Sequence, residues 1–247
     1  MKFIRELVGG LRLLLNVAVR KGAIAVSIET WHKDIFDFLD MKKNSGEERR
    51  RAKELFLNVS ASDIFMERVI ADEGWMLFDP PDVKNLTELY GEEFTAEYLR
   101  YEEIYAITPE FFSNPPMVIK AKDLYKKIQT YYWESGMPFW FFKDNVNRGH
   151  SNPELGIIRS TNLCCEIFQA ADEAKTILCN LASVNLSRIN TVDDMERVIP
   201  IVMRALDNVI DINFYAIPKS EENQRRTRAV GLGIAGEAEL IANKQIM

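Results

Sequence analysis

Short β-rich runs separated by helical segments are the feature that most constrains the fold of this chain. Residues 22–30 predict a β-strand, because Ile24, Val26 and Ile28 fall on one face of an extended segment. Further strands are predicted at residues 55–59, 75–78 and 138–142. Strands that alternate with helices favour a mixed α/β architecture with parallel pairing.

Two helices have clear signals. Apolar and aromatic side chains between residues 121 and 132 recur at i, i+3, i+4 and i+7, which predicts a helix with a buried face, and Gly136 is a stop signal. A longer helix is predicted after Asn190 or Thr191, either of which can cap it. Pro200 lies inside that helix and is expected to kink it, because proline removes one backbone donor.

Composition limits the class of protein. The chain has 247 residues, of which 47% are hydrophobic and 28% charged, as in an ordinary globular protein. The net charge of −6 argues against nucleic acid or an acidic membrane as the main partner. Residues 1–19 are basic and then apolar, but their apolar run is too short to span a membrane, and they predict an amphipathic helix. The three cysteines imply no disulfide framework, which favours a reducing cytoplasmic setting.

Residues 160–167, Ser-Thr-Asn-Leu-Cys-Cys-Glu-Ile, form the candidate site. If this segment is extended, its side chains alternate, and Asn162, Cys164 and Glu166 point to one side while Cys165 points to the other. Two other interpretations apply to the segment alone. Adjacent cysteines are often buried and inert, and a Cys-Cys pair is a poor zinc signal, so no metal is predicted.

The neighbouring sequence favours the functional interpretation. Asn-Leu-Cys-x-Glu-Ile and Leu-Cys-Asn-Leu-Ala-Ser closely resemble signatures of the large, catalytic (alpha) subunit of class I (aerobic) ribonucleotide reductase. The matching stretches keep the family's order and are residues 21–26 leading to 29–35, 143–148, 151–167 and 177–183. The resemblance runs from about Arg20 to the C-terminus.

The resemblance implies part of the family's ten-stranded α/β barrel, with the Cys164 segment as the loop inserted through its centre. We therefore expect a divergent segment at residues 1–19 and an incomplete barrel domain at residues 20–247. The implied function is that of a ribonucleoside-diphosphate reductase large subunit, as a fragment or split piece. The alternative is a truncated, non-catalytic relative that acts at most as an interaction module.

Site roles also follow from the resemblance, residue by residue. Cys164 would carry the thiyl radical, and Glu166 would be the base that accepts a substrate proton. Asn162 would hold the substrate hydroxyls or Glu166, and Cys179 would be one of the two redox-active cysteines. Arg20 would contact substrate or effector, although a solvated charge before a strand is an equal alternative.

The resemblance also implies partners. A metal-containing small subunit would supply the radical, thioredoxin or glutaredoxin the electrons, and nucleotides the allosteric control; no covalently bound cofactor is expected. The substrate would be a ribonucleoside diphosphate. In the family, the partner of the second redox cysteine lies upstream, and this chain has no cysteine before Cys164. Other large-subunit polypeptides are therefore expected to supply the missing parts, because Cys165 should face away from Cys164.

A Gly-x-Gly-x-x-Gly pattern occurs at residues 231–236. A dinucleotide site would also need a strand before the pattern and an acidic residue about 20 positions after it. The sequence shows neither, so this pattern is not interpreted as a cofactor site.

Overall fold

The computed structural model describes residues 23–43 and 51–244. The helix predicted in residues 1–19, and Arg20, lie outside the described residues. The chain divides into two compact units, residues 1–169 and residues 170–247. Each unit is described by itself below. The domain boundary expected at residue 20 stays a prediction.

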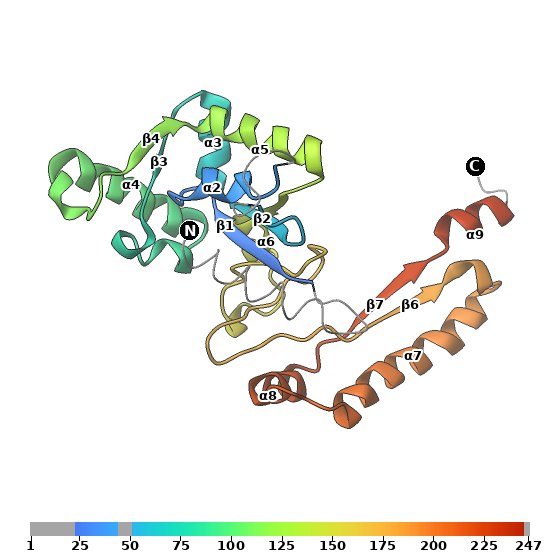
Figure 1. The fold of residues 1–247 in the computed structure, drawn as a ribbon. Helices are drawn as coiled ribbons and strands as arrows, with labels where there is room; N and C mark the ends of the chain where they lie inside the picture. The colour runs from blue at the N-terminus through green and yellow to red at the C-terminus, as the bar shows by residue number, and fades with distance from the viewer. Residues whose placement is uncertain (1–22, 44–50, 245–247) are drawn as a thin grey trace. The chain divides into compact units, whose positions relative to one another are not determined.

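Unit 1 is built on a three-stranded parallel sheet. Its strands are β1 (Ala25–Glu29), β2 (Phe56–Ala61) and β5 (Phe139–Phe142), in the order β1-β2-β5 (Figure 1). All three strands and their parallel pairing were predicted from the sequence, with ends displaced by at most three residues. The mixed α/β class is therefore confirmed.

The two faces of this sheet differ in polarity. One face is apolar, and Ile28, Leu57 and Val59 on it are buried in the main core of the unit. The register places Ser27 beside Asn58 and Asn58 beside Phe139 on the other face. Period-two alternation along the strands gives this second face its polar residues on β1 and β2.

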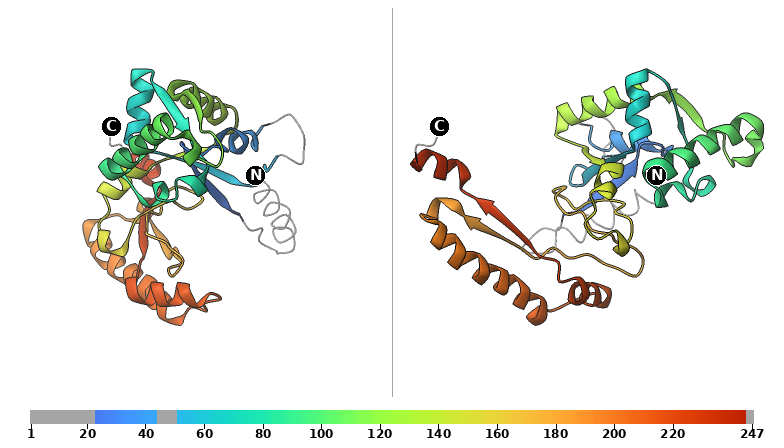
Figure 2. Two further views of the ribbon diagram at one scale, coloured as in Figure 1. Left: turned by 90° about the vertical axis from the view of Figure 1, so that its left-hand side faces the viewer. Right: turned by 180° about the vertical axis from the view of Figure 1, so that it is seen from behind.

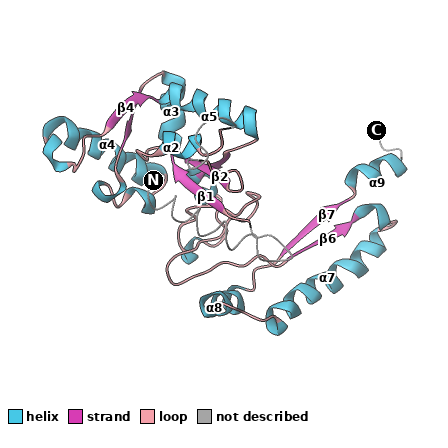
Figure 3. Ribbon diagram, viewed as in Figure 1, coloured by secondary structure: helices cyan, strands magenta, loops and turns pink. Residues whose placement is uncertain are grey.

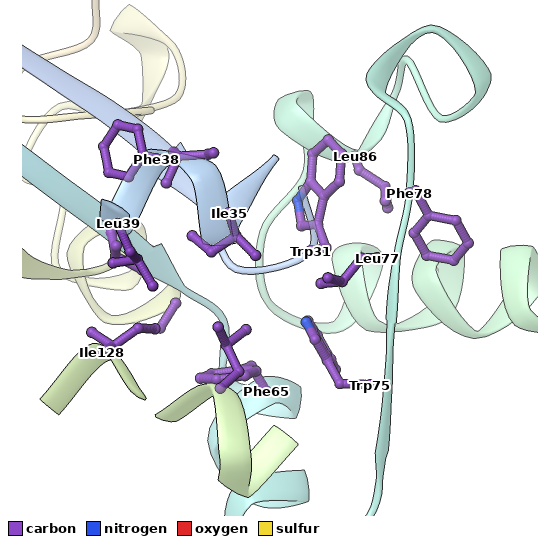
Figure 4. Close-up of a cluster of buried hydrophobic side chains, with 14 of the residues drawn as sticks. Trp31, Ile35, Phe38, Leu39, Phe65, Trp75, Leu77, Phe78, Leu86 and Ile128 are labelled. Atoms are coloured by element: carbon purple, nitrogen blue, oxygen red, sulfur yellow. The ribbon is translucent and has the colours of Figure 1, made fainter. Parts of the chain in front are cut away.

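Helices cover the apolar face. They are α2 (Ile35–Asp40), α3 (Asp63–Ala71) and α5 (Ala121–Ser135), and their buried side chains join the strand residues in one cluster (Figure 4). Within that cluster, Ile35, Phe65 and Ile128 come from the three different helices. The predicted buried face of α5 is confirmed, except that Tyr132 is exposed. Gly136 ends α5 with a φ of 72°, a left-handed conformation that glycine adopts at little cost.

An antiparallel pair lies at one side of unit 1. Strand β3 (Gly74–Leu77) pairs with β4 (Met117–Lys120), and α4 (Gly91–Ile107) packs with them through aromatic contacts. The rings of Trp75 and Tyr98 stack with centroids 4.3 Å apart, and the Tyr98 hydroxyl donates to the Met76 carbonyl. The sequence predicted β3 but not β4, because the four residues of β4 carry no alternating pattern of their own.

Unit 2 contains a parallel pair joined by helices. Strands β6 (Leu181–Asn185) and β7 (Gly231–Ala235) pair in parallel, and the chain between them forms α7 (Val192–Ile212) and α8 (Pro218–Thr227) (Figures 2 and 3). Helix α9 (Glu237–Lys244) follows β7. Thr191 caps α7 in a capping box with Asp194, as one of the two predicted caps. Helix α7 continues through Pro200.

The Gly-x-Gly-x-x-Gly pattern lies mainly on a strand. Residues 231–235 are β7 itself, and Gly236 forms the turn into α9 with a φ of 72°. A dinucleotide-binding loop would instead join a strand to a helix N-terminus. The glycines therefore have a structural explanation that involves no cofactor.

Several short segments complete the description. One-turn 3-10 helices occur at Pro80–Asp82, Leu86–Glu88, Pro109–Phe111, Pro153–Leu155 and Leu186–Arg188. The described strands form one three-stranded and two two-stranded sheets, and no closed barrel is present among them. Within residues 23–43 and 51–244, no helix is long and apolar enough to cross a membrane.

Candidate active site

The segment that leads to the cysteines is held at its base by α6 (Lys143–Arg148). Asn147 of α6 is buried, and its amide makes a two-way contact with the backbone of Ile158: Nδ2 donates to the Ile158 carbonyl and Oδ1 accepts from the Ile158 N–H, each at 2.9 Å. Nδ2 also donates to the Lys143 carbonyl at 2.9 Å. Asn147 thus pairs with Ile158 as a neighbouring strand would.

The first residues of α6 join several elements of unit 1. The buried Asp144 carboxylate accepts from the N–H of Asp63 at 2.7 Å and from the N–H of Gly91 at 2.8 Å, at the starts of α3 and α4. A carboxylate at a helix N-terminus satisfies free N–H groups and the helix dipole. The stretch 143–148 therefore fixes the scaffold beneath the candidate site.

The segment around Cys164 is a turn and not an extended strand, so the condition on which the alternation of its side chains was considered is not met. The Cys165 N–H donates to the Asn162 carbonyl at 3.2 Å, and Cys165 has a φ of 60°, in the left-handed region. Asn162 organises the turn, since its Oδ1 accepts from the N–H groups of Glu166 and Ile167, both at 3.1 Å. Short polar side chains commonly bond the backbone in turns, which strand propensity does not reveal.

The two adjacent thiols have different environments. Cys164 is exposed, whereas Cys165 is half-buried and donates from Sγ to Asn58 Oδ1 at 3.0 Å. Burial raises the pKa of the Cys165 thiol, and the charges of Glu166 and Cys164 raise it further. Glu166 is exposed. The turn therefore presents one thiol and one carboxylate outward and directs the other thiol to the sheet.

A second contact brings the segment back to the sheet. The rings of Phe168 and Phe141 have centroids 6.1 Å apart, so the end of the segment also contacts β5. Within the segment, Thr161 Oγ1 donates to the Ile167 carbonyl at 2.9 Å, and this bond joins the residues before the turn to those after it. Phe141 and Asn58 lie on the same face of the sheet as Ser60. Residues 158–168 thus cover the polar face.

The polar face carries buried groups without hydrogen-bond partners in the described part of the chain. They are Asn58 Nδ2, Ser60 Oγ and, just after β2, Ser62 Oγ. One of them, Ser60, lines a cavity of about 750 Å³ in unit 1, together with Ser27, Glu29, Ser160, Thr161 and other residues. Cavities of this size commonly hold small molecules, and a few convergent polar groups orient what they bind.

Cys179 lies in unit 2, two residues before β6, whereas Cys164 lies in unit 1. Cys179 is exposed and, with Asn180 and Tyr215, lines a cavity of about 270 Å³. The structure describes all three cysteines, and none forms a disulfide. Among the described residues, no group of three or more histidine, cysteine or acidic side chains is arranged to hold a metal ion.

Three structurally important residues were missed by sequence reasoning: Asn58, Asp144 and Asn147. Asp144 and Asn147 lie in the stretch 143–148 that resembles the family. Their partners left no signal in the sequence, because Gly91 lies 53 residues before Asp144 and Ile158, the partner of Asn147, lies in an irregular segment. Asn58 left a weak signal, as a polar residue between the apolar Leu57 and Val59 of a predicted strand.

Unit 1 is thus a mixed α/β domain with a cysteine-bearing turn on the polar face of a parallel sheet. The comparison with protein families identifies its family. Residues 9–247 match the model of the ribonucleotide reductase barrel domain. The chain belongs to the ribonucleotide reductase barrel-domain family.

Curated relatives agree. The ribonucleoside-diphosphate reductase subunit alpha of Helicobacter pylori strain J99 is 42% identical over an alignment 287 residues long, gaps included, which covers 94% of this chain and 36% of the relative. The large subunit of Acanthamoeba polyphaga mimivirus is 40% identical, covering 90% and 25%, and that of Dictyostelium discoideum is 38% identical, covering 90% and 26%. The chain thus spans about a quarter to a third of the length of these relatives.

Proposed function

We propose that this chain supplies the catalytic turn of a ribonucleoside-diphosphate reductase, which replaces the ribose 2′-hydroxyl with hydrogen. One observation carries the proposal: in a chain of this family, Asn162 folds the Asn-Leu-Cys-x-Glu sequence into a turn with Cys164 and Glu166 exposed together. The 750 Å³ cavity, whose lining includes Ser160 and Thr161 of the same segment, is large enough for a nucleotide-sized substrate.

The proposed reaction starts at Cys164. A thiyl radical on its sulfur takes the hydrogen atom from C3′, which leaves a thiol on Cys164 and a radical on the sugar. The Glu166 carboxylate accepts the 3′-hydroxyl proton, and the 2′-hydroxyl leaves as water. Asn162 already bonds the backbone of Glu166 through Oδ1, so its Nδ2 is the donor available to a substrate hydroxyl.

The remaining electrons come from two thiols. Cys179 and a second cysteine become a disulfide; one of their two protons leaves with the 2′-hydroxyl as water, and the other is delivered with two electrons to C2′. Glu166 returns its proton to the 3′ oxygen, and the Cys164 thiol returns its hydrogen atom to C3′ and regains the radical. Disulfide geometry requires the second sulfur to approach Cys179 within bonding distance. We propose that another large-subunit polypeptide contributes that cysteine, and that thioredoxin or glutaredoxin re-reduces the pair.

The other parts of the proposal concern partners. A metal-containing small subunit would generate the radical that reaches Cys164, ribonucleoside diphosphates would be the substrates, and nucleotide effectors would regulate the assembly, with Arg20 as a candidate contact. We propose the cytoplasm as the location, since exposed thiols persist in a reducing compartment.

Isolation of the chain from its native cells tests the proposal. The chain would be captured with its bound partners, the partners identified by mass spectrometry, and deoxynucleotide formation assayed in the complex. We expect a small subunit, a polypeptide bearing a further cysteine, and activity. An inert chain without reductase partners would instead support a non-catalytic relative that acts as an interaction module.

A matched pair of variants tests the site within the active complex. Cys164→Ser should abolish turnover, because a serine hydroxyl does not form the required radical, whereas Cys165→Ser should keep most of it. Substantial turnover by Cys164→Ser would exclude Cys164 as the thiyl residue.

A further inference from the structure

We propose that the hydrogen bond from the Cys165 thiol to Asn58 positions the Cys164 turn on the sheet. This inference rests on the proposed function, in which Cys164 is the reacting thiol. Cys165 and Asn58 are then positioning residues, because they would act through Cys164 and would not touch the substrate.

The first argument comes from the hydrogen bonds of residues 160–167. Among those that the described residues make, the bonds of Thr161, Asn162, Glu166 and Ile167 stay inside the segment. The bond from Cys165 Sγ to Asn58 Oδ1, at 3.0 Å, is the one that leaves it. The internal bonds give the turn its shape, and the thiol bond fixes where that shape sits against β2.

The second argument comes from the backbone. Cys165 has a φ of 60°, a conformation that is unfavourable for residues with a β-carbon. Such a conformation persists where surrounding contacts determine it. Glycine would adopt it without cost but has no side chain to reach Asn58. The cysteine therefore combines a turn conformation with a contact that glycine could not make.

The third argument comes from burial at Asn58. Its side chain is fully buried on β2, and its Nδ2 has no partner in the described part of the chain. The Cys165 thiol is thus the group that satisfies the amide oxygen. Removing it would leave the whole buried amide unpaired, which is more costly than losing an exposed bond. The contact is therefore strongly favoured once the turn is formed.

The same geometry excludes a second role for Cys165. A thiol that reduced substrate or exchanged with a disulfide would have to turn its sulfur toward the reacting groups. Cys165 directs its sulfur to the sheet, whereas Cys164 is exposed. One peptide bond joins the two residues, so fixing Cys165 also limits the directions available to Cys164.

Site-resolved alkylation of the full chain tests the contact without any reductase partner. Trypsin cleavage after Arg159, Lys175 and Arg188 places Cys164 and Cys165 on one peptide and Cys179 on another, and fragmentation separates the first two. Asn58→Ala should raise the iodoacetamide labelling rate of Cys165 about tenfold relative to Cys179. Ser62→Ala is the control, because Ser62 is also a buried polar residue of unit 1 whose Oγ has no partner among the described residues, and it should leave the ratio unchanged.

Turnover in the complete reductase tests the consequence for Cys164. Cys165→Ala should lower kcat about tenfold with little change in KM, because it displaces the reacting thiol and not the substrate. Cys165→Ser should restore most of kcat, since its hydroxyl can donate to Asn58, whereas Cys165→Gly should not. Equal kcat values for the alanine, glycine and serine variants would overturn the proposal.

The two experiments separate this inference from the proposed function. A wild-type chain that is inactive in every complex, yet shows the Asn58-dependent labelling of Cys165, would reject the reductase and keep the contact. An active complex with no change in labelling on Asn58→Ala would keep the reductase and reject the positioning role. If Asn58→Ala does not fold, hydrogen exchange at Glu166 and Ile167 in Cys165→Ala decides, and unchanged exchange would reject the role.

Discussion

The buried Lys143 and the largely buried Glu29 form an ion pair, with Lys143 Nζ 3.0 Å from Glu29 Oε1. The two charges lie just after β5 and at the end of β1, so the pair joins two strands that are not neighbours in the sheet. Each charged group makes one further hydrogen bond: Trp31 Nε1 donates to Glu29 Oε2 at 2.6 Å, and Lys143 Nζ donates to the Thr87 carbonyl at 2.8 Å. Desolvation raises the pKa of Glu29, which Lys143 opposes.

Removing one charge of this pair is the first prediction. Lys143→Met should lower the free energy of unfolding of unit 1 by about 3–5 kcal/mol, because it leaves the Glu29 carboxylate buried without its partner. Urea unfolding followed by tryptophan fluorescence measures this, since all four tryptophans lie in residues 1–169.

The double variant is the control for the ion pair. Lys143→Met combined with Glu29→Gln removes both charges and keeps an acceptor for Trp31, so it should recover most of the lost stability. If the double variant is as unstable as Lys143→Met, the loss comes from packing or from the Thr87 contact and not from an unpaired charge.

The Asn147–Ile158 contact gives the second prediction. Asn147→Ala should lower the free energy of unfolding of unit 1 by about 2–4 kcal/mol, because the buried N–H and carbonyl of Ile158 lose their partner. Hydrogen exchange should become faster in residues 157–163, ahead of global unfolding. Asn145→Ala is the matched control, since Asn145 is an exposed asparagine on the same helix. Similar exchange in the two variants would show that Asn147 does not anchor the segment.

These contacts show what the sequence could and could not predict. The parallel strands and the buried face of α5 were predicted because each signal is local, such as the alternation of Ile24, Val26 and Ile28. Strand β4 was missed because its pairing partner lies far earlier in the chain: Trp75 pairs with Ile119, 44 residues away. Tertiary pairing, and not local propensity, makes that segment a strand.

The candidate site was likewise predicted only in part from the sequence. Motif likeness selected Asn162, Cys164 and Glu166, and their roles remain predictions. The alternation considered for an extended segment does not apply, because the side chain of Asn162 bonds the backbone and forms a turn. Asn58 could not be identified as the partner of Cys165, since a contact across 107 residues leaves no local pattern.

The pH dependence of Cys165 alkylation is the third prediction. Burial raises its pKa, so at any pH below that value the folded chain holds less of the reactive thiolate than an unfolded chain does. The alkylation midpoint of Cys165 should therefore lie at higher pH in the folded chain than in urea. Glu166→Gln should lower the folded midpoint, because the Glu166 charge contributes to the shift. Glu154→Gln changes an exposed carboxylate and is the control. Coincident midpoints in folded and unfolded chains would contradict the burial of the thiol.

Gly236 and Gly136 provide the fourth prediction, because both have a φ of 72° and differ in their surroundings. A β-carbon at Gly136 would meet nothing within 4 Å, whereas one at Gly236 would collide with Asn185 Oδ1. That oxygen accepts from the Ser187 N–H at 3.0 Å and from the Ser187 hydroxyl at 2.9 Å, so it has little freedom to move.

The two alanine variants therefore separate backbone strain from steric conflict. Gly136→Ala should cost about 1–2 kcal/mol of local stability at the end of α5, from the left-handed conformation alone. Gly236→Ala should cost more, with exchange protection lost along β6 and β7, because its β-carbon also displaces Asn185. Hydrogen exchange resolved by peptide measures both in one chain. Equal costs would mean that Asn185 moves freely, and the last glycine of the Gly-x-Gly-x-x-Gly pattern would then be required for its φ and not for close packing.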